Sequence, residues 1–141
     1  MKFLCIIPAR GGSKSLKLKN IKKIKNIPLI NFTIILALKS KIFDNIVVST
    51  DNKRIKKNCL KFKKILTFDR RPAISKDDST TEETVEDVLK KIKLKKNYFP
   101  DWIFILEPTS PLRSIRTIIK AKQIIKKNNK KINSLLSIKK I

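Results

Sequence analysis

The only two glycines of the chain, Gly11 and Gly12, stand side by side after an apolar run that ends in Pro-Ala-Arg. At the average usage of ~7%, a chain of this length would hold about ten. Glycine lets backbone N–H groups approach a phosphate closely and tolerates a positive φ. Cationic and hydroxyl side chains that can bind the same phosphate flank the pair: Arg10, Ser13, Lys14 and Lys19. This stretch predicts a loop that holds nucleotide phosphates, and a simple tight turn is the alternative.

Several common kinds of site are excluded by the residues that the chain lacks. Neither GxxxxGK[ST] nor G-x-G-x-x-G occurs, so the glycine loop is neither a Walker A loop nor a dinucleotide fingerprint. The sequence has no histidine, which excludes Ser-His-Asp and Cys-His catalysis and a Cys/His zinc site. Two cysteines are too few for a disulfide framework. Cys5 lies inside an apolar run and is expected to be a core thiol.

The net charge of +24 raises the possibility of a nucleic-acid partner. A compositional explanation fits better. Lys, Ile and Asn, which are all encoded by A/T-rich codons, supply 63 of the 141 residues, and the lysines fall almost everywhere along the chain. Aromatic residues fall at expected core positions and are not interleaved on a basic face. We therefore expect no nucleic-acid partner, and a basic nucleic-acid-binding protein stays as an alternative.

Apolar runs alternate with helical patterns along the chain, which indicates an α/β protein. Strands are expected over 2–8, 44–50, 64–68, 101–107 and 133–141. Helices are expected over 28–41, 51–62, 80–94 and 115–129, with Thr80 or Thr81 capping the third and Asp51 or Thr50 the second. This alternation predicts a mostly parallel sheet with helices on both faces, in one domain over 1–141.

No segment reaches the ~18–20 apolar residues of a membrane span and no signal peptide is evident, so the expected location is the cytoplasm, with no membrane partner.

The polar loops at 8–20, 69–80 and 107–114 each follow a predicted strand. In a parallel sheet, the carboxyl ends of the strands lie along one edge, where ligands bind. We therefore expect these three loops to form one site.

Four sequence segments together resemble the acylneuraminate cytidylyltransferases, also called CMP-sialic acid synthetases. "IIPARGGSK…KNI" is similar to the opening of that family, and the segment over 28–55 to its helix and strand ending in Ser-Thr-Asp. "RPAISKDDSTT" and "LEPTSPLR" resemble two later motifs. Their order and spacing agree over nearly the whole chain. The resemblance implies a Rossmann-like three-layer αβα nucleotidyltransferase fold.

The family resemblance also implies a reaction. CMP would pass from CTP to a sialic-acid-type nine-carbon 2-keto sugar acid, with release of pyrophosphate, for surface glycans such as lipopolysaccharide. A CTP-binding fragment that is inactive or depends on a partner is the alternative. CTP and the sugar acid are the implied partners, and Mg²⁺ is the implied cofactor.

The catalytic residues implied by the resemblance are Arg10 and Lys19, which would contact the CTP phosphates. Arg71 would read the cytosine carbonyl, and Asn20 would lie at the mouth of the nucleotide site. Asp78 and Ser79 would help Arg71, although they could instead cap the following helix. The full substrate-binding set comprises Ala9, Gly11, Gly12, Ser13, Lys14, Asn20, Arg71, Asp78, Ser79, Glu107, Thr109 and Ser110, of which the last three would face the sugar and ribose.

The sequence departs from the family pattern at three places. Ser15 stands where the family usually has glycine, and Glu107 replaces the usual Gln, so an amide donor is lost. The chain also ends at Ile141. The resemblance implies that C-terminal strands, a dimerisation arm and the carboxylate ligands of Mg²⁺ lie beyond that residue. No metal ligand is therefore expected within the chain, and the homodimer of the full-length family is doubtful for it.

Overall fold

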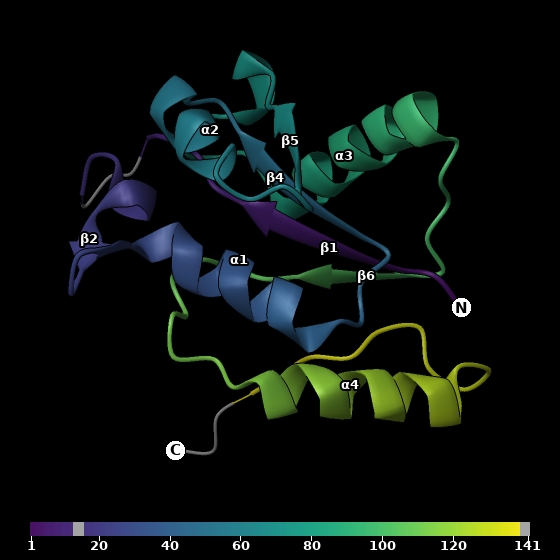
Figure 1. Cartoon of the computed structure of the whole chain (residues 1–141). Coiled ribbons are helices and arrows are strands. Elements are labelled where there is room, and N and C mark those ends of the chain that lie inside the picture. The colour runs from purple at the N-terminus through teal and green to yellow at the C-terminus, as the bar shows by residue number, and fades with distance from the viewer. Residues whose placement is uncertain (13–15, 139–141) are drawn as a thin grey trace.

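A four-stranded parallel sheet forms the centre of the computed structural model, which describes residues 1–12 and 16–138 (Figure 1). Its strands are β1 (Phe3–Pro8), β4 (Asn45–Thr50), β5 (Leu66–Asp69) and β6 (Trp102–Ile105). They lie in the order β5-β4-β1-β6, and every pair is parallel. The first four predicted strands are confirmed, each within about two residues at its ends.

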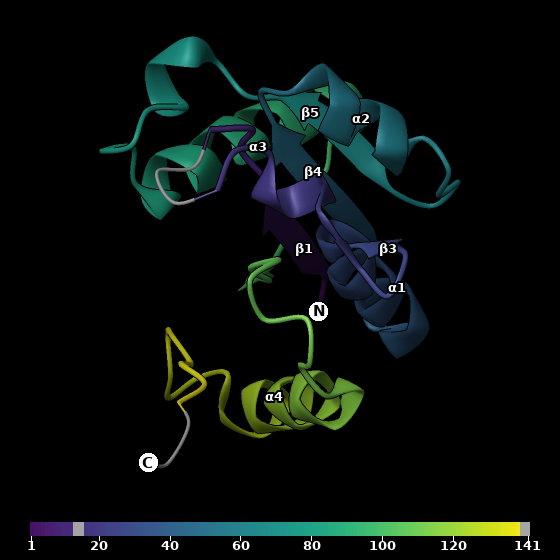
Figure 2. The same ribbon diagram turned by 90° about the vertical axis from the view of Figure 1, so that its left-hand side faces the viewer.

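Helices cover both faces of the sheet, which confirms the predicted three-layer arrangement (Figures 1 and 2). They are α1 (Leu29–Ser40), α2 (Lys53–Cys59), α3 (Thr81–Lys96) and α4 (Ile115–Asn128). Alternate residues of β1 point to opposite faces. Cys5 and Ile7 join a core with α1, α2 and α4, and Leu4 and Ile6 join a second core with α3. This burial on both faces explains why β1 reads as a continuous apolar run.

Three helices begin at side-chain caps, and the cap of α4 is Ser114, whose Oγ accepts from the N–H of Arg116 at 3.2 Å. Asn52 caps α2, since its side chain accepts hydrogen bonds from the N–H groups of Arg54 and Ile55. The prediction of Asp51 or Thr50 at this position was wrong by one or two residues. Thr80 caps α3 in a reciprocal capping box with Glu83. This confirms Thr80, which was one of the two predicted caps.

We expect Thr80→Ala to lower the free energy of unfolding by about 1 kcal/mol, the usual contribution of a helix cap. Thr80 Oγ1 accepts from the N–H of Glu83 at 3.2 Å, and Glu83 Oε2 accepts from the N–H of Thr80 at 2.8 Å. Thr81→Ala is the matched control, because Thr81 is the first residue of the helix and is exposed. Urea denaturation of both variants measures the difference, and equal losses would show that the capping box contributes nothing.

The predicted strand over 133–141 is wrong for residues 133–138, which form no strand. Its residues 139–141 lie outside the described part. The apolar pattern was correctly recognised, but a strand also needs a neighbouring strand to accept its backbone hydrogen bonds. Leu136 and Ile138 are instead 83% and 82% exposed.

A small hairpin was missed by the sequence analysis. It joins β2 (Lys23–Ile24) to β3 (Ile27–Pro28) through Lys25 and Asn26, whose φ angles are 47° and 65°. Positive φ at both central residues is the geometry of a type I′ hairpin turn. Asn26 was the available signal, because asparagine adopts this conformation more readily than most residues.

Both cysteines are buried free thiols, as expected for Cys5. Burial raises the pKa of Cys59 to about 11, and burial likewise raises the pKa of Cys5. Neither thiol is therefore suited to act as a nucleophile at neutral pH.

In the described part of the chain, no helix combines the length and the apolar character that crossing a membrane requires.

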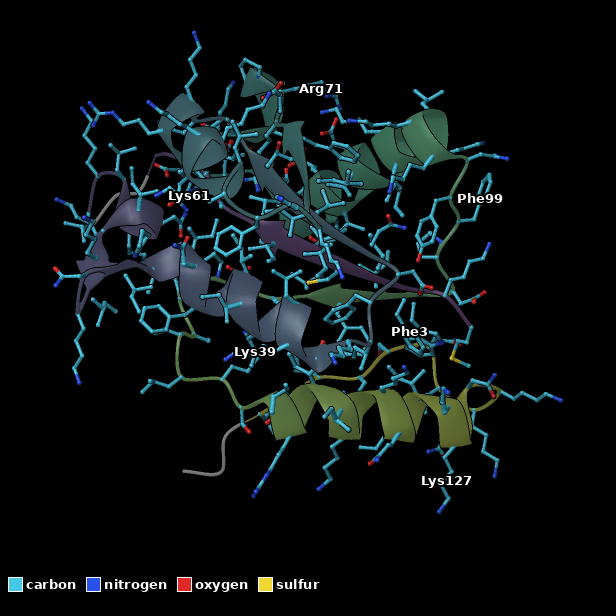
Figure 3. All side chains as sticks on the ribbon, in the orientation of Figure 1. Phe3, Lys39, Lys61, Arg71, Phe99 and Lys127 are labelled. Atoms are coloured by element: carbon cyan, nitrogen blue, oxygen red, sulfur yellow. The ribbon has the colours of Figure 1, made fainter. Side chains whose placement is uncertain are left out.

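Lysines are spread over the surface, in agreement with the compositional explanation of the charge. Figure 3 shows Lys39 on α1, Lys61 just after α2 and Lys127 on α4, and all three are exposed. These side chains extend from separate elements and do not line up along one helix.

Candidate functional site

The site lies where the order of the strands reverses. Within the sheet, β1 lies between β4 and β6. The chain passes from β1 through α1 to β4 on one flank, and later through α3 to β6 on the opposite flank. In open α/β sheets, ligands bind in the crevice that such a reversal opens at the carboxyl ends of the strands. A pocket of about 270 Å³ lies at this position beyond β1 and β6.

The three predicted loops come together around this pocket, which confirms that they share one edge of the sheet. The first contributes one wall, the segment over 76–84 a second, and the residues after β6 a third. The lining residues are Pro8, Arg10, Gly12, Lys19, Asn20, Arg70, Lys76, Asp77, Ser79, Thr80, Thr81, Thr84, Glu107, Pro108 and Thr109.

The first loop folds back on itself, so that Lys19 and Asn20 reach the same pocket as Arg10. The buried Asn20 side chain donates through Nδ2 to the carbonyl of Arg10 at 3.0 Å. Leu18, in the left-handed region with φ 55°, donates its N–H to the carbonyl of Gly11 at 3.3 Å. These two bonds close the loop and place two of its cations, Arg10 and Lys19, in the pocket wall.

The two glycines differ in their surroundings. The N–H of Gly11 donates to Asp51 Oδ1 at 2.7 Å, so it already has a partner within the protein. Gly12 lines the pocket and has open space where a side chain would lie. Neither adopts a positive φ. Gly11 is needed for close packing against Asn52.

Arg10 reaches across the pocket to the opposite wall. Its Nη1 donates to Asp77 Oδ1 at 2.7 Å and to the carbonyl of Lys76 at 3.0 Å. Both side chains remain partly exposed, at 32% for Arg10 and 46% for Asp77. Asp77 was absent from the predicted set, because its partner lies 67 residues away in the sequence.

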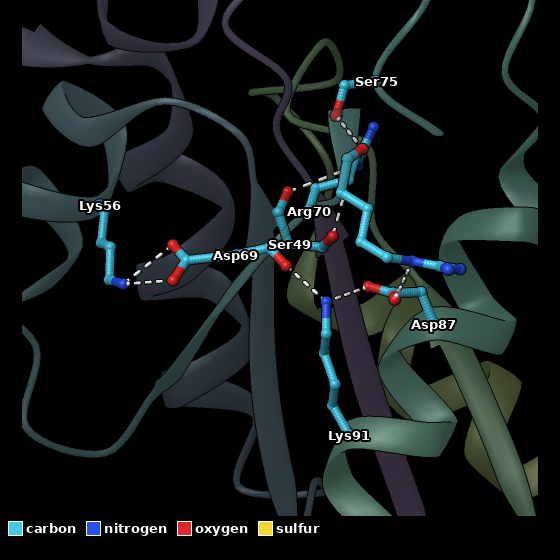
Figure 4. A network of polar contacts seen from close by, with 8 residues as sticks. Ser49, Lys56, Asp69, Arg70, Ser75, Asp87 and Lys91 are labelled. Atoms are coloured by element: carbon cyan, nitrogen blue, oxygen red, sulfur yellow. Dashed lines mark hydrogen bonds and ion pairs between the residues drawn. The ribbon is translucent and has the colours of Figure 1, made fainter. Parts of the chain in front are cut away.

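Arg70 is a second pocket residue that the sequence analysis missed. It is only 8% exposed, and its guanidinium donates to Ser49 Oγ at 3.3 Å and to the carbonyl of Ser49 at 3.4 Å (Figure 4). Burial lowers the pKa of Arg70, and the nearby Asp51 carboxylate opposes that shift. The available signal was its position directly after β5, at the same edge as the glycine loop.

Arg71, the predicted cytosine contact, does not line the pocket. Its side chain is 61% exposed, and its Nε donates to Asp87 Oδ1 on α3 at 3.1 Å. Asp87 also pairs with Lys91, so this carboxylate holds two cations outside the pocket (Figure 4). Arg71 would have to leave Asp87 to reach a ligand.

The other predicted residues divide into three groups. Ser79, Glu107 and Thr109 line the pocket, together with Asn20. Ala9 lies in the hydrophobic core and donates its N–H to the carbonyl of Ser49 at 2.9 Å; Asp78 and Ser110 are exposed and outside the lining. Ser13 and Lys14 lie outside the described residues, as does Ser15.

The charges of the pocket favour an anionic ligand. Its lining carries four cationic side chains, Arg10, Lys19, Arg70 and Lys76, against the two carboxylates of Asp77 and Glu107. Behind Glu107, burial lowers the pKa of Arg113. Arg113 Nη1 is buried and has no hydrogen-bond partner among the described residues.

The residues of the pocket do not fit a metal site by themselves. Among residues 1–12 and 16–138, no three His, Cys, Asp or Glu side chains come together in a way that could hold a metal ion. Of the two pocket carboxylates, Asp77 is already paired with Arg10. No catalytic step can therefore be derived through a metal ion held by this part of the chain.

The chain thus has a parallel sheet with a cationic pocket at the point where the strand order reverses. This arrangement is typical of Rossmann-like α/β proteins that bind phosphorylated ligands. The fold resembles a solved structure of CMP:2-keto-3-deoxy-manno-octonic acid synthetase complexed with CTP. The TM-score is 0.77 at 22% identity, over 92% of this chain and 49% of that one. At that identity, the likeness shows the nucleotidyltransferase fold alone.

Sequence comparison is more specific. The Cytidylyltransferase family profile matches residues 4–140, and the chain therefore belongs to that family of nucleotidyltransferases. It is 38% identical to CMP-N,N'-diacetyllegionaminic acid synthase of Legionella pneumophila, over 98% of this chain and 59% of that protein. It is 39% identical to pseudaminic acid cytidylyltransferase of Campylobacter jejuni, over 79% of this chain and 48% of that protein. With N-acylneuraminate cytidylyltransferase of Streptococcus agalactiae, the identity is 37% over 80% of this chain and 26% of that protein. The chain thus spans less than two thirds of each relative.

Proposed function

We propose that this chain forms the CTP-binding portion of a cytidylyltransferase that transfers CMP to a sialic-acid-type nine-carbon 2-keto sugar acid. The observation that carries the proposal is the pocket at the strand reversal, into which the glycine loop brings both Arg10 and Lys19. A triphosphate needs such cations around it. Membership of the Cytidylyltransferase family supports cytidine as its base.

The proposed reaction is a displacement at the α-phosphorus of CTP. The anomeric hydroxyl of the sugar acid forms the new oxygen–phosphorus bond and gives up its proton to the surrounding water. The bond from the α-phosphorus to the bridging oxygen of the β-phosphate breaks, and pyrophosphate leaves with the electron pair. Positioning and charge stabilisation supply most of the catalysis in phosphoryl transfer of this kind. Arg10 and Lys19 are placed to offset charge that develops on the phosphates.

The remaining side chains of the pocket can be given proposed roles. Asn20 holds the glycine loop closed at the mouth, and Ser79 offers a hydroxyl from the opposite wall. Arg70 is better placed than Arg71 to contact a bound nucleotide, because Arg70 lines the pocket and Arg71 is paired with Asp87. On the side of β6, Glu107 and Thr109 would face the ribose and the sugar.

The identity of the sugar acid is a separate proposal. The relatives are named for legionaminic, pseudaminic and neuraminic acids, and each acid carries a carboxylate. The carboxylate of Glu107 would repel such an anion unless a cation is near, and Arg113 lies close enough to Glu107 for the two charges to interact. We propose that these acids, presented with Mg²⁺, are the acceptors to test first.

The direct test is calorimetric titration of the purified chain with CTP, together with an assay of pyrophosphate release. Each of the three sugar acids is supplied with CTP and Mg²⁺. We expect CTP binding, and pyrophosphate release with any of the acids would show that this chain by itself also carries out the transfer. Binding without pyrophosphate would leave a CTP-binding module and refute turnover by this chain. If no CTP binds while RNA binds in a salt-sensitive manner, the proposed function is wrong. The charge of +24 would then indicate a nucleic-acid-binding protein.

A further inference from the structure

One ion pair bridges the two walls of the candidate pocket. Arg10 belongs to the glycine loop, and Asp77 belongs to the segment between β5 and α3. The same Nη1 that donates to Asp77 also donates to the carbonyl of Lys76. This one nitrogen is therefore bound twice to the opposite wall.

The segment that Arg10 contacts is a compact turn. Lys76 donates its N–H to Ser79 Oγ at 3.0 Å, and Ser79 donates its N–H to the carbonyl of Lys76 at 3.2 Å. At the base of the turn, Ser75 Oγ donates to the carbonyl of Arg71 at 2.8 Å. These internal bonds favour movement of residues 75–79 as one unit, with Arg10 as the side chain that holds it against the glycine loop.

We propose that the Arg10–Asp77 bridge is a strap that nucleotide phosphates open when they enter the pocket. This inference rests on the proposed function, and it assigns Asp77 a positioning role that acts through Arg10. Asp77 holds the guanidinium across the pocket when no phosphate is present. A triphosphate then competes with Asp77 for the same donors, because phosphate oxygens are strong acceptors for guanidinium N–H groups.

The energetics suit a strap that opens easily. A partly exposed ion pair contributes little net stability, since water screens its charges. A bound triphosphate presents several negative charges and can replace one carboxylate at Arg10. The carboxylate of Asp77 also repels those charges as they approach. Removing it while keeping the shape of the side chain should therefore favour the bound state.

The test compares Asp77→Asn with Asp69→Asn, with CTP and inorganic pyrophosphate as the probes. Asp69 also forms an exposed ion pair, with Lys56 at 2.8 Å, but it lies outside the candidate pocket. Both changes remove one negative charge and one ion pair. We expect Asp77→Asn to bind each probe up to about fivefold more tightly than the unchanged chain. We expect less than a twofold change for Asp69→Asn. Weaker binding by Asp77→Asn, or equal effects of the two changes, would overturn the strap.

Amide hydrogen exchange without nucleotide separates this inference from the proposed function. If the strap holds the turn, Asp77→Asn should speed exchange over 75–79, and Asp69→Asn should not. Unchanged exchange over that turn would overturn the strap, whether or not CTP binds. Faster exchange in a chain that binds neither CTP nor pyrophosphate would show that the bridge holds the turn but is not opened by nucleotide phosphates, and the proposed function would fail separately.

Discussion

Replacing Lys19 with alanine is expected to weaken CTP binding by about 10- to 100-fold, as measured by calorimetric titration. A hydrogen bond to a charged group contributes ~1.5–3 kcal/mol, and each 1.4 kcal/mol changes a dissociation constant tenfold. Lys19 lines the pocket and forms no ion pair with any described residue, so its charge is available to a ligand. The backbone of Lys19 supports the loop through its N–H and carbonyl, which alanine retains.

Lys17→Ala is the matched control for this prediction. Lys17 belongs to the same loop, is exposed and lies outside the pocket lining, so its removal tests the general effect of one lost charge. Lys19→Arg should recover part of the affinity, because a cation remains at that position. If Lys17→Ala and Lys19→Ala weaken binding equally, Lys19 contributes only to the overall field of the chain and makes no direct contact.

The parallel sheet could be predicted from the sequence because its strands are buried on both faces. Cys5 and Ile7 pack against one layer of helices and Leu4 and Ile6 against the other, so no polar residue interrupts the run. The start of α3 could also be predicted from the sequence, because Thr80 and Glu83 have the spacing of a capping box. Such features depend on local chemistry that the sequence displays directly.

Features that depend on distant partners could not be predicted. Arg70 and Arg71 are adjacent and chemically identical, and successive residues of an extended segment point in opposite directions. Which one enters the pocket depends on how β5 pairs with β4, where Thr50 lies opposite Asp69. The contact of Asp77 with Arg10 likewise requires two loops to meet across the sheet edge. The sequence predicted that the three loops share one edge of the sheet, but it did not settle which charges face one another.

Gly11→Ala is expected to lower the free energy of unfolding by about 1–3 kcal/mol, the usual cost of inserting a methyl group into a filled space. A Cβ at Gly11 would lie 2.7 Å from Asn52 Nδ2 and 2.8 Å from Asn52 Cβ. Asn52 cannot rotate away without cost, because its Oδ1 caps α2 through the N–H groups of Arg54 and Ile55. The strain would also pull the N–H of Gly11 away from Asp51.

Gly12→Ala isolates this packing effect, because a Cβ at Gly12 meets no atom within 4 Å. Neither glycine has a positive φ, so alanine at either position gains the same small benefit from a less flexible unfolded chain. The difference between the two variants in urea denaturation therefore reports the clash with Asn52. Equal stabilities would mean that Asn52 yields at no cost. The contact of Gly11 with the N-cap residue of α2 would then not be a requirement of the fold.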